Sequence, residues 1–399
     1  MKTLLVGYKA ADLTPELLEG DVTCHVLDIY HRHAIEKVHH AKVVCSAHLP
    51  EGAWDVVKFK TGPKIHSGEL SLDLLQECYK VAGLRGRDAP APLSGRAEVA
   101  FEGRGRDAPA PLGGRAEVAF EGRGRDAPAP LGGRAEVAFE GRGRDAPAPL
   151  SGRVEVVFEG RERDRNDLLN KIKDDPKRVR SFRAEWPASV PGGEKLMFTS
   201  YPGCFCHRRL DEGGLALAEV VSREMLHQTG AGETPPPHEE RNLKVLDMGC
   251  GCGLVGLLVA NRLNQSINQP VNPPIEQSEQ SNNRTISLVL VDSHARAVEA
   301  ATENAAKFGI EAEVILSDNG TPERMDGTFD VFVGNPPYYS DYRIAEVFLE
   351  TAKRALKPGG ICYTVVKNAA GLRPVQERYF PHVEVVGRRG YNVLRSKKE

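Results

Sequence analysis

The sequence predicts two α/β domains, the second built on a doubly wound, mostly parallel seven-stranded sheet. The chain has 399 residues, which is enough for two domains with separate cores. In the second half, short apolar runs alternate with amphipathic stretches, a pattern typical of a parallel sheet covered by helices on both faces. A glycine-rich segment follows the first of these runs, as expected where a strand turns into a helix.

Composition narrows the class of protein. Lys and Arg number 53 and Asp and Glu 55, so the formal net charge is -2 and a nucleic-acid partner would have to be held by local patches. The eight cysteines lack the dense spacing of secreted disulfide proteins, and no run of eighteen apolar residues could cross a membrane. We therefore expect a cytoplasmic protein without a membrane partner.

Residues 1–84 predict strand-rich α/β structure. Apolar runs and one amphipathic stretch occur at Leu4–Val6, Val26–Leu27, Val43–Val44, Val56–Val57 and Leu70–Val81. No glycine-rich loop follows any of these runs, so this half lacks the signature of a cofactor site. Its histidines have no cysteine or acidic partners at convincing ligand spacing, and no metal is predicted anywhere in the chain.

A nineteen-residue unit recurs almost unchanged between residues 85 and 163. Its Pro- and Gly-rich part is poor in helix potential, whereas the part resembling Arg-Ala-Glu-Val-Ala-Phe-Glu alternates like a short strand. A solenoid of strands is one interpretation. Because each unit offers little apolar surface to offset chain ordering, a loosely ordered insert at 85–153 is favoured. The better strand Val154–Phe158 would then resume an N-terminal domain that spans residues 1–190.

Residues 191–399 predict the second domain. Its strands are expected at Val245–Asp247, Ser287–Asp292, Glu313–Leu316, Asp330–Val333 and Gly360–Val366, with a closing hairpin of Val383–Val386 and Tyr391–Leu394. Helices are expected from the glycine loop to Ala260, around Ala295–Ala305 and at Ile344–Leu356. Residues 261–284, rich in Asn, Gln, Ser and Pro, predict a disordered polar insertion.

The glycine loop predicts a nucleoside cofactor. Gly249, Gly251 and Gly253 remove side chains where the strand becomes a helix, which lets backbone amides approach a ligand closely. The same loop contains a Gly-x-Gly-x-x-Gly pattern that also fits a dinucleotide. Asp247 favours S-adenosylmethionine, because a carboxylate suits the cationic amino-acid part of that cofactor and would repel a pyrophosphate.

Polar residues at the ends of the next two strands extend the predicted cofactor site. Asp292 is placed to accept both ribose hydroxyls, and the polar insertion explains why it lies thirty-nine residues after Gly253. Asp318 is placed to accept the adenine amino group, with Asn319 adjacent. A solvated carboxylate at the end of a strand is the alternative for each acid.

Asn335-Pro336-Pro337-Tyr338 predicts an amine-binding tip at the carboxyl edge of the sheet. The two prolines fix φ and remove amide donors, so the side-chain oxygen of Asn335 and the carbonyl of Pro336 can each accept a hydrogen bond from an exocyclic NH₂. Tyr338 would stack on the base. These contacts would orient the nitrogen and stabilise the charge that develops as a methyl group arrives. A stiff turn without a catalytic role is the alternative.

In combination, these motifs resemble the class I S-adenosylmethionine-dependent methyltransferases, and specifically the two-domain guanine-N2 methyltransferases of ribosomal RNA. Phe198–Phe205 and Leu210–Gly214 resemble the segment leading into that family's catalytic half, where a Pro-Gly-x-Phe loop and a Leu-Asp-x-Gly turn border the cofactor. The resemblance therefore adds Phe205 to the cofactor-binding candidates. Leu356–Gly360 and Gly390–Leu394 follow in the order typical of the family.

The resemblance implies methyl transfer to the N2 amine of a guanine, with ribosomal RNA or a ribosomal subunit as the partner. It also implies that the N-terminal domain is a degenerate methyltransferase-like domain without cofactor. Adenine-N6 and glutamine-N5 methylation use the same amine-binding logic and stay open, as does a non-catalytic RNA-binding assembly factor. Basic residues within 161–183 and 388–398 are candidate RNA-facing patches, although acids interleave with those of the first.

Overall fold

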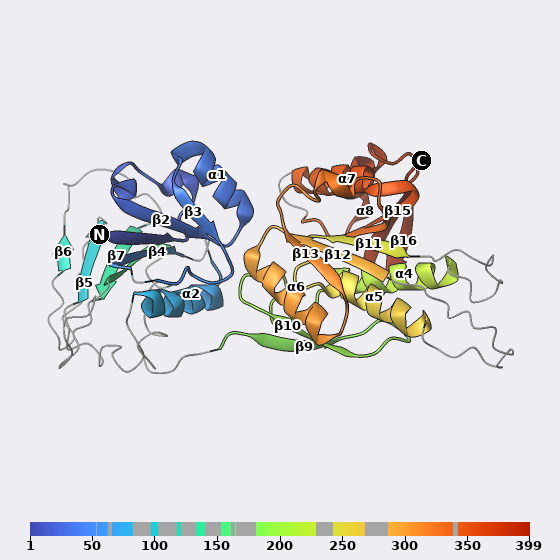
Figure 1. Cartoon of the computed structure of the whole chain (residues 1–399), viewed down its shortest axis with the longest axis horizontal. Coiled ribbons are helices and arrows are strands. Elements are labelled where there is room, and N and C mark those ends of the chain that lie inside the picture. Colours follow the sequence, from blue (N-terminus) through green and yellow to red (C-terminus); the bar gives the residue numbers. More distant parts are fainter. Residues whose placement is uncertain are drawn as a thin grey trace. The chain divides into compact units, whose positions relative to one another are not determined.

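A computed structural model describes residues 1–52, 54–62, 66–82, 97–102, 118–120, 133–139, 153–160, 164, 181–228, 242–267, 286–337 and 342–399. The chain divides into two compact units, Met1–Phe182 and Arg183–Glu399, each with its own sheet (Figure 1). The α/β class expected for both halves is confirmed. The division lies before residue 190 because β9 (Ala184–Ala188) pairs with β10 (Leu196–Ser200) inside the second unit.

The first unit contains a five-stranded parallel core in the order β3-β2-β1-β4-β8. Its strands are β1 (Lys2–Val6), β2 (Asp21–Val26), β3 (Lys42–Cys45), β4 (Val56–Thr61) and β8 (Arg153–Gly160). Two helices, α1 (Ile29–His39) and α2 (Gly68–Val81), complete the core. Neighbouring strand residues point to opposite faces, so Leu5 joins the cluster around Ile35 of α1 while Leu4 packs with Leu74 of α2.

Three segments of the tandem array form strands rather than the loosely ordered insert that was favoured. They are β5 (Ala97–Glu102), β6 (Val118–Phe120) and β7 (Gly133–Phe139). β7 pairs antiparallel with β8 and with β5, and β6 pairs parallel with β5, so the array extends the sheet sideways. The free edge of β8 explains this outcome, because its backbone groups offer a template for further pairing. The array residues between these strands lie outside the described ranges.

The second unit has the expected seven-stranded, mostly parallel sheet, in the order β13-β12-β11-β14-β15-β17-β16. The strands are β11 (Leu243–Met248), β12 (Ile286–Asp292), β13 (Ala312–Leu316), β14 (Phe329–Gly334), β15 (Leu356–Val366), β16 (Glu384–Arg388) and β17 (Tyr391–Lys397). β11, β12, β13, β14 and β15 pair with one another in parallel. β17 runs antiparallel to both β15 and β16. The closing hairpin thus lies where the sequence predicts it.

Helices cover both faces of this sheet (Figure 1). One apolar cluster contains residues of α4 (Glu212–Gln228), α5 (Leu254–Ile267) and α6 (Ala295–Lys307), and the other contains residues of α7 (Arg343–Ala355) and α8 (Ala369–Glu377). The prediction that disorder begins at residue 261 is wrong for 261–267, because α5 continues through them and buries Leu263. Residues 268–285 lie outside the described ranges. Among the described residues, no helix has the length and apolar character required to cross a bilayer.

Candidate functional site

Three predicted motifs lie at one edge of the second sheet. Met248, the last residue of β11, is in register with Val291 of β12 and Gly334 of β14. The residues that come directly after these positions, namely the glycine loop, Asp292 and Asn335, therefore share the carboxyl edge of three adjacent strands. Ligands of open α/β sheets bind at this edge.

Two glycines of the loop are tightly packed, and the third is not. A Cβ atom at Gly249 would lie 2.6 Å from Phe348 Cζ, and one at Gly253 would lie 2.7 Å from Leu257 Cδ1. Gly251 has φ 57°, but a Cβ atom there would meet nothing within 4 Å among the residues that the structure describes. Gly249 and Gly253 are thus required for close packing, whereas Gly251 borders open space at the sheet edge.

Backbone amides of the loop bind the neighbouring strand. The amides of Gly249 and Cys250 donate to the Val291 carbonyl at 2.8 and 3.0 Å, and the Gly251 amide donates to Asp292 Oδ2 at 2.8 Å. The second oxygen of Asp292 accepts from the His294 amide at 2.9 Å. The sequence predicted that the loop amides approach a ligand, whereas these three anchor the loop to β12. Since each carboxylate oxygen has two lone pairs, holding the loop does not by itself prevent Asp292 from accepting a ligand hydroxyl.

Asp247 lies beneath the loop with its side chain buried. Its Oδ2 atom accepts a hydrogen bond from the Gly256 amide at 2.8 Å. Burial raises the pKa of Asp247 to about 7; the Gly256 amide opposes the rise, and the negative charges of Asp292 and Asp211 add to it. Three carboxyl groups at this edge therefore influence one another, and a cationic ligand would relieve their repulsion.

Asn335 has a fixed orientation. Its Nδ2 atom donates to Asp211 Oδ2 at 2.8 Å across 124 residues of sequence. An ionised carboxylate only accepts, so the amide must turn its NH₂ group toward Asp211, which leaves Oδ1 directed elsewhere. Pro336 is buried, and Tyr338 lies outside the described residues. The sequence analysis did not join Asp211 to Asn335; its only signal was the place of Asp211 in the Leu-Asp-x-Gly turn.

The remaining predicted cofactor residues lie on two other segments. Asp318 and Asn319 follow β13, and the Ser317 amide between them and that strand donates to the Asp292 carbonyl at 2.9 Å. The side-chain oxygen of Asn319 accepts from Ser317 Oγ at 2.8 Å. Phe205 lies on the segment between β10 and α4, where its ring is 67% exposed. Asp318 and Asn319 thus reach the same strand ends as Asp292, while Phe205 comes from a separate turn.

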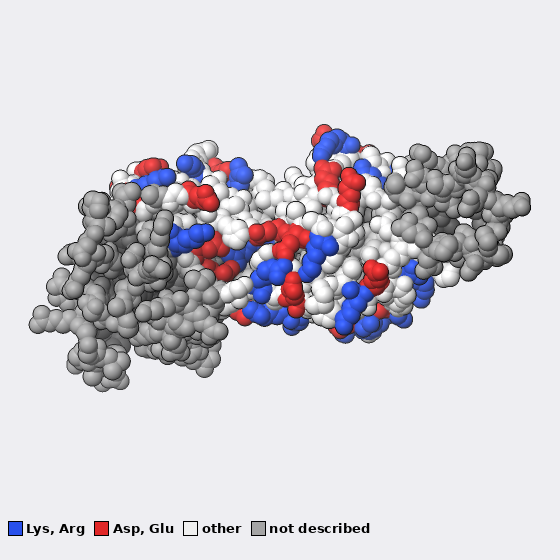
Figure 2. All heavy atoms as spheres, turned by 60° about the horizontal axis from the view of Figure 1, so that its bottom comes forward, with Lys and Arg blue, Asp and Glu red and all other residues white. Residues whose placement is uncertain are grey.

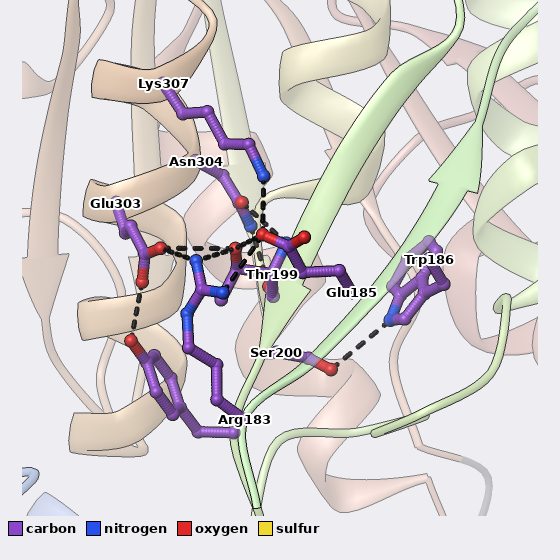
Figure 3. A network of polar contacts seen from close by, with 9 residues as sticks. Arg183, Glu185, Trp186, Thr199, Ser200, Glu303, Asn304 and Lys307 are labelled. Atoms are coloured by element: carbon purple, nitrogen blue, oxygen red, sulfur yellow. Dashed lines mark hydrogen bonds and ion pairs between the residues drawn. The ribbon is translucent and has the colours of Figure 1, made fainter. Parts of the chain in front are cut away.

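A polar network joins β9 and β10 to α6 (Figure 3). Asn304 extends this network to the glycine loop. The buried Asn304 side chain donates to the carbonyls of Thr199 and Cys252, both at 2.9 Å, and accepts from the Thr199 amide at 2.8 Å. Arg183 pairs with Glu303 on the same helix. These contacts bind β10 to α6 and bind α6 to the loop. The sequence analysis missed Asn304, because its partners lie 52 and 105 residues away.

The predicted basic cluster near the C-terminus is largely neutralised. Arg388 and Arg389 both pair with Glu219, whose side chain is only 2% exposed, and Arg395 pairs with Glu384 at 2.8 Å. Acidic and basic groups are intermixed on the face shown in Figure 2. Most of the other predicted patch, at 161–163 and 165–180, lies outside the described residues. The charge pattern of this face and of the C-terminal cluster therefore favours no particular RNA path.

The described residues do not favour a metal site or a reactive thiol. Within the part of the chain that the structure describes, no three His, Cys, Asp or Glu side chains gather into a metal site. Burial raises the pKa of the Cys250, Cys252 and Cys362 thiols above its ordinary value. The thiolate form needed for a metal ligand or a nucleophile is thereby disfavoured.

Comparison with known proteins shows which family the second unit resembles. The model of the methyltransferase small domain family matches residues 195–272 and 274–395. Similar curated proteins include ribosomal RNA small subunit methyltransferase C of Alcanivorax borkumensis, 28% identical over 190 residues, and that of Hahella chejuensis, 30% identical over 190 residues. These matches cover 47% and 46% of this chain and 47% and 44% of the two relatives, so the chain spans about half the length of the curated relatives it matches.

A solved structure shares the fold over the whole chain. It is a 16S rRNA N2 methyltransferase (RsmC) of T. thermophilus in complex with AdoMet and guanosine, with a TM-score of 0.61, 16% sequence identity, and coverage of 100% of this chain and 88% of that one. The family model spans about half of the chain and includes the glycine loop and the Asn-Pro-Pro segment. The chain therefore belongs to the methyltransferase small domain family.

Proposed function

We propose that this chain transfers a methyl group from S-adenosylmethionine to the exocyclic N2 amine of a guanine in ribosomal RNA. The observation that carries the proposal is the bond from Asn335 Nδ2 to Asp211 Oδ2, at 2.8 Å, which fixes the amide so that its acceptor oxygen, Oδ1, is directed away from Asp211. The names of the A. borkumensis and T. thermophilus relatives support the choice of ribosomal RNA, and the AdoMet and guanosine of the second support the choice of cofactor and base.

The residues at the sheet edge fit S-adenosylmethionine. Among the described residues, apart from the chain neighbours of Gly251, no atom lies within 4 Å of the place of a Cβ at Gly251. The neighbouring carboxyl groups favour a ligand with sulfonium and ammonium charges. We assign its binding to Asp247, Gly249, Gly251, Gly253 and Asp292. Asp318, Asn319 and Phe205 would contact the adenosine part, as their motifs suggest.

The chain's own groups would bind and orient the amine. The bound cofactor supplies an electrophilic methyl group. An exocyclic amine on an aromatic ring is a weak nucleophile, because its lone pair is delocalised into the ring. Asn335 Oδ1 and the Pro336 carbonyl would accept its two N–H groups, which localises the lone pair and stabilises the developing positive charge. Tyr338 would hold the base flat by stacking. This chemistry needs no covalent nucleophile, in keeping with the raised pKa of the buried thiols.

The first unit would bind no cofactor. Its strand order matches that of the second unit, but a single glycine, Gly7, follows β1 where β11 is followed by three. A Cβ atom at Gly7 would lie 2.4 Å from the Lys60 carbonyl, so the protein itself fills this position. We therefore propose that this unit is a degenerate copy of the methyltransferase fold.

Labelled S-adenosylmethionine, incubated with the protein and with separated hypomethylated ribosomal RNAs and subunits, tests the function. After digestion to nucleosides, the label is expected in N2-methylguanosine. Label in N6-methyladenosine would show that the target base is adenine and not guanine. Label in a glutamine of a protein would show that the substrate is a protein and not RNA. If no RNA or protein acquires label, the non-catalytic assembly factor becomes the better assignment.

A further inference from the structure

We propose that Asp211 is a positioning residue for Asn335, and that it selects the amide orientation in which Asn335 can accept the substrate amine. The inference deepens the methyl-transfer function proposed above and rests on it. Asp211 lies outside the Asn-Pro-Pro-Tyr motif, 124 residues before Asn335 in the sequence.

Asp211 has a structural role that must be separated from this one. It lies directly before α4, where its Oδ1 atom accepts from the Gly213 amide at 3.0 Å and its carbonyl accepts from the Leu215 amide at 2.9 Å. These bonds are those of a helix N-cap, a position that Asp, Asn and Ser all fill well. Of the two carboxylate oxygens, the Gly213 amide engages Oδ1.

The other oxygen, Oδ2, receives the Asn335 amide at 2.8 Å. Gly214 leaves room for Oδ2 because it has no side chain: a Cβ atom at this position would lie 2.6 Å from Oδ2. Burial raises the pKa of Asp211, whereas hydrogen bonds from Gly214, Asn335 and Gly213 oppose the rise by favouring the ionised form. One side chain thus joins the start of α4 to the tip that follows β14.

The orientation matters because an asparagine amide presents a donor on one side and an acceptor on the other. If the amide were rotated by half a turn, Oδ1 would face the carboxylate and the NH₂ group would face the substrate amine, and neither contact is a hydrogen bond. A bond to an ionised acceptor is roughly twice as strong as a neutral one, and it polarises the amide. Asp211 would therefore both select the competent orientation and strengthen Oδ1 as an acceptor.

Three variants of the full chain separate positioning from capping. Asp211→Ser keeps an N-cap oxygen but has no second acceptor for Asn335. Asp211→Asn keeps the cap with its single carbonyl oxygen and turns its NH₂ group toward Asn335, which favours the reversed orientation of the Asn335 amide. Asp211→Ala removes both. For each, the kcat and KM for hypomethylated ribosomal RNA, the Kd for S-adenosylmethionine by calorimetry and the Tm are measured.

For Asp211→Ser we expect a Tm close to wild type and a kcat lower by about 10- to 100-fold, the scale of misplacing a reacting group. The cofactor Kd should change much less than kcat, because the charge of Asp211 affects the pKa of Asp247 less than burial, the Gly256 amide or Asp292 does. Asp211→Asn should have a Tm close to wild type and a kcat at least as low as that of Asp211→Ser, because it offers Asn335 a donor and no acceptor, and Asp211→Ala should lose both kcat and Tm. Wild-type kcat in Asp211→Ser would overturn the proposal. So would a joint loss of Tm, cofactor affinity and kcat in that variant, or a wild-type kcat in Asp211→Asn.

A readout without turnover tests the same contact. In selectively ¹⁵N-labelled protein, the Asn335 side-chain N–H resonance should shift upfield in Asp211→Ser and in Asp211→Asn, because the charge-assisted bond is lost in both. An unchanged resonance in both variants would contradict the bond. If the wild-type protein methylates no RNA but the resonance shifts as expected, the proposed function fails while the Asp211–Asn335 contact stands.

Discussion

The two units of this chain share a strand order and differ in the loops at the ends of their strands. β3-β2-β1-β4-β8 in the first unit corresponds to β13-β12-β11-β14-β15 in the second, with parallel neighbours throughout. After β11 come the glycine loop and the 14-residue helix α5. After β1 come only two short 3₁₀ turns, Ala10–Asp12 and Glu16–Leu18. The first unit thus lacks the helix N-terminus that a nucleoside cofactor uses in such folds.

The equivalent edges also differ in the groups that occupy them. Near the end of β4, Lys60 pairs with Asp12 at 2.6 Å and Glu159 at 2.7 Å, and its side chain is 8% exposed. β14 ends instead in Gly334, followed by Asn335. In the first unit the protein's own charges satisfy one another, whereas the second unit leaves mutually repelling carboxyl groups beside open space. A shared topology therefore does not imply a shared site, since the site depends on the loops.

Asn335→Ala should produce the largest effect. The amide oxygen that binds the amine is removed, so kcat should fall by at least about 100-fold, the scale of losing one preorganised polar contact. The Kd for S-adenosylmethionine should stay near wild type, because Asn335 is assigned to the substrate. Single-turnover kinetics and calorimetry check the two quantities. Equal loss of both would contradict the assigned role.

A matched pair of glycine substitutions should separate the two edges. Gly251→Ala introduces a methyl group into open space and should weaken S-adenosylmethionine binding by about tenfold, at a stability cost of about 1 kcal/mol for its positive φ. Gly7→Ala meets the Lys60 carbonyl and should destabilise the first unit by more than that, with cofactor Kd unchanged. Denaturant unfolding and calorimetry measure both. The comparison fails if Gly7→Ala weakens the cofactor as much as Gly251→Ala.

Cofactor binding should be linked to a proton. With its pKa raised to about 7, Asp247 is partly protonated in the folded chain near neutral pH, and a cationic cofactor favours its ionised form. S-adenosylmethionine should therefore bind more tightly as pH rises through 7 and should release a proton on binding. Calorimetry in buffers of different ionisation enthalpy detects that proton. Asp247→Asn should abolish its release, and proton uptake by the wild-type protein would be the opposite of this expectation.

The raised pKa of Asp247 also makes the free energy of unfolding depend on pH. The folded chain holds this proton up to a pH of about 7, whereas an unfolded Asp loses it near 3.9. The folded state therefore binds more protons between these values, so the contribution of Asp247 to the free energy of unfolding should decline as pH rises from about 4 to 7. Unfolding of wild type and Asp247→Asn across this range checks the slope. Identical slopes would show that Asp247 is not the group responsible.

Lys60→Met should have the smallest effect. The ion pairs to the partly exposed Asp12 and Glu159 would be lost, which should lower the free energy of unfolding by about 1 kcal/mol. Cofactor affinity and kcat should not change, because this edge is assigned no ligand. A clear drop in cofactor affinity would reopen the first unit as a cofactor site.

The sheet of the second unit could be predicted closely from sequence. Its central strands, such as Leu243–Met248 and Ile286–Asp292, are buried on both faces and therefore appear as continuous apolar runs. The motif positions could be predicted as well, because glycine and proline restrict the chain locally. The array strands could not be predicted in the same way, since their order depends on pairing with the edge of β8 rather than on their own apolar content.

The contacts within the site were the part that sequence could not supply. Asp211 meets Asn335 and Asn304 meets Cys252 only because strands and helices distant in sequence are packed together. The loop amides at Gly249 and Cys250 likewise bind Val291, a partner set by strand register. Residue type indicated that these groups are polar and well placed, but the fold decides which donor meets which acceptor.

Calorimetric titration of the full chain with S-adenosylmethionine tests the contrast between the two edges most directly. One molecule should bind per chain, binding should be lost or strongly weakened in Asp292→Ala, and it should be unaffected in Lys60→Met. Two molecules per chain, or unchanged binding in Asp292→Ala together with loss in Lys60→Met, would contradict the assignment of the cofactor to the second unit.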